Sequence, residues 1–192
     1  FHLNRLISYL FSRPKGIYNK TMRIFIIGPT ASGKTTIGKK LAEGLNMNFI
    51  DTDKEIEKAT GVDITWLFDI EGEKGFRERE EDILLKVSKL NSCVISTGAG
   101  SILKESNRDL ISSSGKVIYL EASIESQLKR TSFDKARPLL SKGNKEKILK
   151  KMDRDRRHLY EELADITIKP DKKSRNEIVN EITLELKKNS DE

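Results

Sequence analysis

A glycine-rich segment near the start of the chain constrains the fold more than any other feature. Residues 28–35 read GPTASGKT and fit the pattern G-x-x-x-x-G-K-[ST]. They follow the apolar run 23–27 and precede residues 33–45, where apolar side chains recur at helical spacing. In this context the glycines let successive backbone N–H groups point into one concavity at the positive end of a helix. The segment therefore predicts a loop that binds phosphate groups, called the phosphate loop below.

The phosphate loop offers both contacts and charge to a bound nucleotide, which we expect to be ATP. Lys34 can reach the β- and γ-phosphates, and the Thr35 hydroxyl can ligate Mg²⁺. The four fixed positions occur by chance in under about one percent of chains of this length. The loop alone does not distinguish an ATPase, a GTPase or a kinase. Residues expected to contact ATP here are Ala31, Ser32, Gly33, Lys34, Thr35 and Thr36.

Apolar runs alternate with helical patterns along the rest of the chain. Strands are expected at residues 23–27, 48–51, 94–97, 116–120 and 165–168. Helices are expected at residues 33–45, 53–60, 64–70, 73–90, 124–130, 147–164 and 174–187. This alternation predicts an α/β fold with a parallel sheet covered by helices on both faces. Ligands bind beyond the carboxyl ends of the strands in such sheets, so function is expected just after the first four strands.

Composition and charge narrow the classes of protein. The chain has 192 residues, 36% of them hydrophobic, which suits about one globular domain. The formal net charge is +6, and residues 1–21 supply +4 of it because they carry four basic residues and no acids. The rest of the chain is therefore only weakly basic, which does not indicate a surface that binds nucleic acid. No stretch approaches the ~20 apolar residues of a membrane span.

Residues 1–21 leave two interpretations open. Leu3, Leu6 and Leu10 recur at helical spacing among basic residues, which is compatible with a weak amphipathic targeting segment. Met22, however, directly precedes the first expected strand. We therefore favour a disordered or non-native extension at 1–21 and one domain at 22–192.

The single cysteine, Cys93, lies in an apolar run with Val94 and Ile95. One cysteine cannot form an internal disulfide, which favours a reducing, cytoplasmic compartment. Its apolar neighbours predict a small buried hydrophobe rather than a catalytic thiol.

Polar side chains follow the second and precede the third expected strand. Asp51 could hold a Mg²⁺-bound water, and Asp53 could orient or deprotonate an acceptor hydroxyl. Spacing alone equally allows Asp53 to cap the helix that starts at Lys54. Arg77 could bind a carboxylate bidentately, although the residues alone favour a solvated helix face with i,i+4 ion pairs.

Residues 97–100, TGAG, follow the third apolar run and are called the acceptor turn below. Small residues there let backbone N–H groups approach a ligand closely. An ordinary tight turn is the alternative.

Several motifs together resemble the shikimate kinases. Besides the phosphate loop they are DTD at 51–53, GFR at 75–77, TGAG at 97–100, RPLL at 137–140 and R-x-x-LYE at 156–161, in the order and spacing of that family. The resemblance runs from about Met22 to Lys188. It implies a three-layer P-loop kinase fold with a five-stranded parallel sheet, helices on both faces and a mobile lid at about 131–147.

The resemblance also implies an activity. This is ATP-dependent phosphorylation of the 3-hydroxyl of shikimate, in chorismate and aromatic amino-acid biosynthesis, by a cytoplasmic monomer that uses Mg²⁺. The metal would be held at Thr35 and Asp51. Lys34, Asp53 and Arg137 form the implied catalytic set, and no nucleic-acid or membrane partner is expected.

The implied binding residues are carried over position by position. Asp53 contacts the acceptor hydroxyls, and Arg77 binds the shikimate carboxylate. The backbone of Ala99 contacts shikimate. Arg156 is the second carboxylate-binding arginine, with the adjacent Arg157 as the alternative. On the donor side, Arg137 in the lid meets the ATP phosphates, and Arg130 matches a position near the adenine.

One position departs from the family, because the middle glycine of the acceptor turn is Ala99. Alanine is tolerated there if its φ is negative, whereas a positive φ would cost about 1 kcal/mol. We expect retained activity with a changed shikimate affinity. Three alternatives stay open: another P-loop kinase such as a gluconate or nucleotide kinase, a non-catalytic relative that only Ala99 supports, and a nucleic-acid-binding NTPase that only the pI supports.

Overall fold

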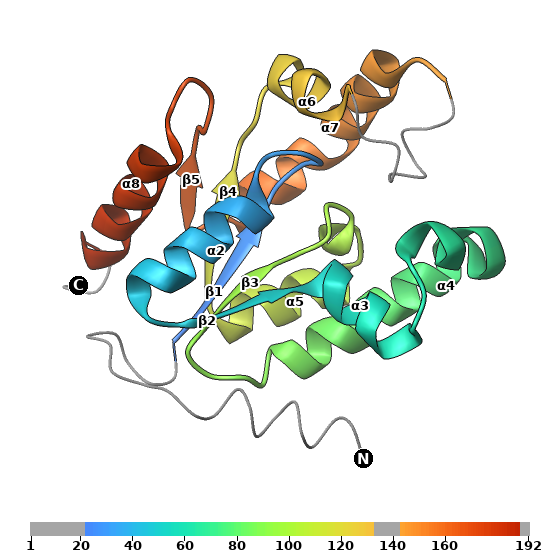
Figure 1. Cartoon of the computed structure of the whole chain (residues 1–192), viewed down its shortest axis with the longest axis horizontal. Helices are drawn as coiled ribbons and strands as arrows, with labels where there is room; N and C mark the ends of the chain where they lie inside the picture. Colours follow the sequence, from blue (N-terminus) through green and yellow to red (C-terminus); the bar gives the residue numbers. More distant parts are fainter. Residues whose placement is uncertain (1–21, 133–142, 189–192) are drawn as a thin grey trace.

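The computed structural model describes residues 22–132 and 143–188. Three expectations lie outside the described residues. They are the extension at 1–21, most of the lid at 131–147, and Arg137 within that lid. The described residues form one sheet with helices packed around it (Figure 1).

Five strands form the sheet, and every pair in it is parallel. They are β1 (Arg23–Ile27), β2 (Asn48–Asp51), β3 (Cys93–Ser96), β4 (Lys116–Leu120) and β5 (Ile166–Ile168). Their order across the sheet is β2-β3-β1-β4-β5, so β1 is central. Four of its five residues have no exposed surface, as expected for a strand covered on both faces. The predicted five-stranded parallel sheet is confirmed.

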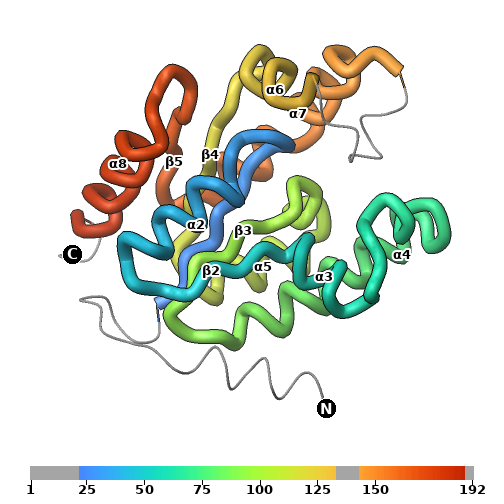
Figure 2. Tube along the Cα trace, in the orientation of Figure 1, coloured from blue at the N-terminus to red at the C-terminus, as the bar shows by residue number. Residues whose placement is uncertain are grey.

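Helices cover both faces of the sheet. They are α2 (Lys34–Leu45), α3 (Thr52–Thr60), α4 (Ile64–Val87), α5 (Glu105–Ser114), α6 (Ile124–Thr131), α7 (Lys145–Leu163) and α8 (Arg175–Lys188), with a short 3-10 helix η1 (Ser101–Leu103). Ile24 and Ile26 of β1 pack with α2 and α8, whereas Phe25 and Ile27 pack with α3, α4, α5 and α7. This alternation along one strand separates two apolar layers. Figure 2 shows α8 beside β5 and the pair α3 and α4 on the side of β2.

The sequence predicted α4 correctly but missed α5. The expected separate helices at 64–70 and 73–90 correspond to α4, which is interrupted at Gly72 (φ 68°, ψ −176°). No helix was expected between residues 100 and 116, and this was wrong because α5 lies there. Its sequence ESNRDLISSS carries four serines that favour caps and turns, and only Asn107 and Ile111 are buried. None of the described helices is long and apolar enough to cross a membrane.

The buried position of Cys93 predicts an unreactive thiol. Cys93 is almost fully buried at the start of β3, and burial raises the pKa of its thiol to about 12. Because the thiolate is the reactive form, iodoacetamide at pH 8 should label the native chain at least about 100-fold more slowly than the urea-unfolded chain. Mass spectrometry of quenched samples measures both rates. Equal rates would contradict this account of β3.

Candidate active site

The phosphate loop connects β1 to α2 through three residues with positive φ. These are Gly28 (144°), Ala31 (58°) and Gly33 (99°). A Cβ atom at Gly28 would lie 2.7 Å from the carbonyl oxygen of Leu120, so glycine is required there. Gly33 is the N-cap of α2. The loop therefore curls over the positive end of a helix, which is the arrangement that binds anions.

Lys34 and Thr35 begin α2 with their side chains engaged in the loop region. Nζ of Lys34 donates to the carbonyl oxygens of Gly28 and Pro29, both at 2.8 Å. Oγ1 of Thr35 donates to Oδ2 of Asp51 at 2.7 Å, which joins the loop to the end of β2. A hydroxyl and a carboxylate oxygen at this spacing are hard ligands that suit Mg²⁺ when phosphate oxygens and water complete its shell.

A cleft of about 550 Å³ extends from the phosphate loop to the acceptor turn. Of the residues from Ala31 to Thr36 expected to contact ATP, Ser32 alone does not line the cleft, and its side chain is buried. Arg130 of α6 lines the cleft and donates from Nη1 to the carbonyl oxygen of Ala31 at 2.9 Å. The structure thus places Arg130 beside the phosphate loop.

Asp51 and Asp53 have different positions at the end of β2. The N-cap of α3 is Asp51, whose Oδ1 accepts from the backbone N–H groups of Asp53 (3.1 Å) and Lys54 (3.3 Å). The capping alternative considered for Asp53 is therefore wrong. Asp53 lies in the first turn of α3 and lines the cleft, with its Oδ1 2.9 Å from where a Cβ on Gly98 would be. Its carboxylate is placed against the acceptor turn.

Arg77 lines the cleft from α4 between two carboxylates. Nη1 donates to Glu80 at 2.7 Å, and Nη2 donates to Glu73 at 3.0 Å. Glu80 is completely buried and also accepts from Oγ of Ser101 at 2.6 Å. Burial lowers the pKa of Arg77, but the two carboxylates outweigh burial and raise it overall. The guanidinium is therefore a fixed cation rather than part of a freely solvated helix face.

Glu80 was not predicted as part of the site, although the sequence contains a signal for it. It stands in the run Arg77–Asp82, where every residue is charged and a solvated face looks plausible. Phe76, Ile83 and Val87 are buried on the same helix, and Glu80 falls between them at helical spacing. A carboxylate at a position of the buried stripe, three residues after an arginine, indicates a buried ion pair.

The acceptor turn requires small residues at two of its four positions. A Cβ at Gly98 would lie 2.3 Å from Oε1 of Glu80, and one at Gly100 would lie 2.3 Å from Nη1 of Arg77. Ala99 lines the cleft. Among the described residues, the non-glycine positions with positive φ are Ala31, Asn46, Ser92 and Lys172, so Ala99 is not in the left-handed region. Alanine is thus compatible with the backbone at the middle position.

Arg156 and Arg157 of α7 point to different surroundings. Nη1 of Arg156 approaches the carbonyl oxygen of Ala99 at 3.4 Å, and Arg156 lines the cleft. Arg157 instead pairs with Asp153 at 3.0 Å and with Glu121 at 2.8 Å. The geometry therefore favours Arg156, as expected, for a contact with a ligand in the cleft.

Comparisons with known proteins identify the family of this chain. The protein family described as shikimate kinase matches residues 30–187. A shikimate kinase of Vibrio cholerae is 47% identical over 83% of this chain and 91% of its own length, and one of Haemophilus influenzae is 48% identical over 83% and 89%. The structure of an Acinetobacter baumannii shikimate kinase in complex with shikimate aligns with a TM-score of 0.86 and 39% identity, covering 88% of this chain and 94% of that one. The chain belongs to the shikimate kinase family.

Proposed function

We propose that this chain transfers the γ-phosphoryl group of ATP to the 3-hydroxyl of shikimate, a step of chorismate and aromatic amino-acid biosynthesis. The observation that carries the proposal is one cleft that joins the phosphate loop to Asp53, Arg77 and Arg156. The carboxylate of Asp53 can accept a proton or hydrogen bond from a hydroxyl, and the two arginines can bind a carboxylate. Together they suit a small polyol that carries a carboxylate. Membership of the shikimate kinase family supports the same substrate.

On the donor side, backbone N–H groups of the phosphate loop bind the β- and γ-phosphates, and Lys34 neutralises the charge that develops during transfer. Arg130 contacts the nucleotide near its base. Arg137 meets the phosphates from the lid, as proposed from the family resemblance alone. Bound Mg²⁺, held by Thr35 and through water by Asp51, would neutralise part of the phosphate charge.

On the acceptor side, Arg77 and Arg156 bind the shikimate carboxylate, and the backbone of Ala99 contacts the ring substituents. Asp53 accepts the proton of the 3-hydroxyl as its oxygen forms the bond to the γ-phosphorus. The bond from that phosphorus to the β,γ-bridging oxygen breaks, and ADP leaves. Such a transfer depends on alignment and charge neutralisation more than on covalent catalysis.

The test is coupled ADP release by the full chain with ATP, Mg²⁺ and a panel of acceptors that includes shikimate, gluconate and nucleoside monophosphates. We expect shikimate alone to support turnover. Asp53→Asn should lower kcat by about 10²–10⁴-fold because the proton acceptor is lost. Asp69→Asn, at an exposed position of α4 outside the cleft, is the matched control. No shikimate-dependent ADP release from the unmutated chain would overturn the proposal.

The acceptor turn gives a second test, because Ala99 already carries a Cβ, whereas a Cβ at Gly100 would meet the guanidinium of Arg77. Ala99→Gly should change the KM for shikimate by less than about threefold, which is less than the sequence led us to expect, since Ala99 does not have a left-handed backbone. Gly100→Ala should raise that KM by about 30-fold, because its Cβ would displace a guanidinium that two carboxylates fix. An overpacking cost of about 2 kcal/mol corresponds to this change. Steady-state kinetics measure the KM for shikimate of both variants. A large fall in this KM in Ala99→Gly would mean that alanine in the natural turn impairs shikimate binding.

We further propose that the protein acts as a cytoplasmic monomer without nucleic-acid or membrane partners. This proposal rests on the family resemblance. Light scattering coupled to size-exclusion chromatography tests the monomer, and a dimer mass at micromolar concentration would contradict it.

A further inference from the structure

Tyr160 of α7 is linked to the acceptor turn by a short hydrogen bond. Its hydroxyl donates to the carbonyl oxygen of Ala99 at 2.5 Å, across 61 positions of the chain. Its side chain is 2% exposed, so water does not compete for this contact. Burial, the largest cause, raises the pKa of the Tyr160 hydroxyl, which therefore stays protonated and able to donate across the neutral range.

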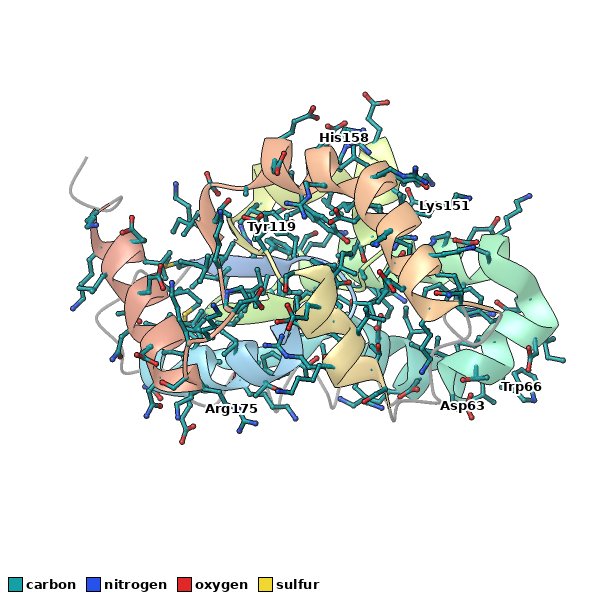
Figure 3. The ribbon with its side chains drawn as sticks, turned by 90° about the horizontal axis from the view of Figure 1, so that it is seen from above. Asp63, Trp66, Tyr119, Lys151, His158 and Arg175 are labelled. Carbon is teal, nitrogen blue, oxygen red and sulfur yellow. The ribbon has the colours of Figure 1, made fainter. Side chains whose placement is uncertain are left out.

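The ring of Tyr160 is held by a second aromatic ring. Tyr119 of β4 stacks on it with ring centroids 5.1 Å apart and an interplanar angle of 17°. Figure 3 places Tyr119 on the face of the sheet that α7 covers, whereas His158 of the same helix points outward. Because Tyr119 belongs to the sheet, the stack fixes the Tyr160 hydroxyl relative to the strand ends.

The carbonyl oxygen of Ala99 has a second neighbour among the cleft residues. Nη1 of Arg156 lies 3.4 Å from it, which is a long contact beside the 2.5 Å bond from Tyr160. Tyr160 thus satisfies most of the need of this oxygen for a donor. The guanidinium of Arg156, which carries five N–H donors, also interacts with the Tyr160 hydroxyl, and its remaining donors can serve a ligand in the cleft.

The same bond sets the direction of a whole peptide group. The peptide between Ala99 and Gly100 is planar and trans, so its C=O and N–H point in opposite directions. Holding the carbonyl toward α7 therefore directs the N–H of Gly100 away from α7. Ala99, Gly100 and Arg156 all line the cleft, so the Tyr160 hydroxyl influences three residues of the acceptor side.

We infer that Tyr160 is a positioning residue for the acceptor: its hydroxyl orients the acceptor turn and leaves Arg156 available for the acceptor carboxylate. The inference rests on the proposed function for the identity of the acceptor, but not for the geometry. Tyr160 itself lies outside the cleft lining, so it acts through Ala99 and Arg156. A purely structural role, in which only the packing of the ring matters, is the competing account.

Tyr160→Phe separates the two accounts because it removes the hydroxyl and keeps the stacked ring. Tyr119→Phe is the matched control, since it removes the hydroxyl from the other ring of the same pair. We expect Tyr160→Phe to raise the KM for shikimate about tenfold and to change the KM for ATP less than twofold. The control should change neither value. Unchanged shikimate KM in Tyr160→Phe, or a parallel rise of both KM values, would overturn the inference.

Hydrogen exchange provides a readout that does not depend on the acceptor. In Tyr160→Phe, the amides of residues 99–101 should exchange at least tenfold faster than in Tyr119→Phe, while amides of β1 exchange at equal rates in both. This pattern supports the positioning role even if shikimate proves not to be the acceptor. Equal exchange of residues 99–101 in the two variants would overturn it, whatever the activity assay gives.

Discussion

Replacing Lys34 by methionine should lower kcat/KM for ATP by about 10³-fold. The lysine is nearly buried at the base of the cleft, with its ammonium 2.8 Å from two loop carbonyls. Arg130 also reaches the loop, but its contact there is with the carbonyl oxygen of Ala31. Loss of a single preorganised donor to developing charge costs about 10²–10³-fold, and loss of a full charge next to a transferring phosphoryl group costs more.

Lys40→Met is the matched control for this change, because Lys40 belongs to the same helix and does not line the cleft. It should retain activity within about twofold, and both variants should have similar melting temperatures. Steady-state kinetics at saturating shikimate measure the difference. A Lys34→Met variant that keeps a tenth of the activity would mean that the loop backbone alone stabilises the transferred group.

Arg77→Lys should raise the KM for shikimate by about 100-fold. Lysine keeps the positive charge but cannot form the fork that binds Glu73, Glu80 and a substrate carboxylate together. It would also leave the buried Glu80 with a weakened partner, and disruption of such a pair costs about 2–5 kcal/mol. The KM for ATP should change little because the phosphate loop is not altered.

Arg79→Lys is an internal comparison two residues along the same helix. Arg79 is more exposed than Arg77 and pairs with Glu71 rather than with a residue that lines the cleft. Its replacement should leave both KM values within about twofold, because exposed ion pairs contribute little. If the two variants behave alike, Arg77 does not contact the acceptor.

The donor side could be predicted from the sequence because its information is local. The phosphate loop is eight consecutive residues, and the strand before it and the helix after it confirm the motif. The buried run of β1 and the apolar stripe of α2 are likewise visible in short windows. These elements were predicted within one or two residues of their observed bounds.

The acceptor side could be predicted only in part, because its contacts join distant segments. The φ of Ala99 and the distinction between Arg156 and Arg157 depend on how α7 packs against the acceptor turn. The strand order β2-β3-β1-β4-β5 also cannot be predicted from any one short stretch of sequence. Tyr160 entered the sequence argument only as one letter of the motif R-x-x-LYE at 156–161, because a hydrogen bond over 61 positions leaves no local pattern.

The interruption of α4 at Gly72 gives the outer part of the acceptor side a stability of its own. Residues 64–71 contain one fully buried side chain, Leu67, whereas the part of α4 after the break carries Phe76, Ile83 and Leu84 in the core. Ile64 and Phe68 also pack against the core but are only partly buried, so we expect this segment to open at a lower free energy than the central strands. Substitutions in residues 64–71 can therefore change the opening rate of this segment without lowering the free energy of global unfolding. Because Ile64 and Phe68 line the cleft, we expect such substitutions to change the speed of acceptor exchange while the sheet that aligns the reacting groups stays intact.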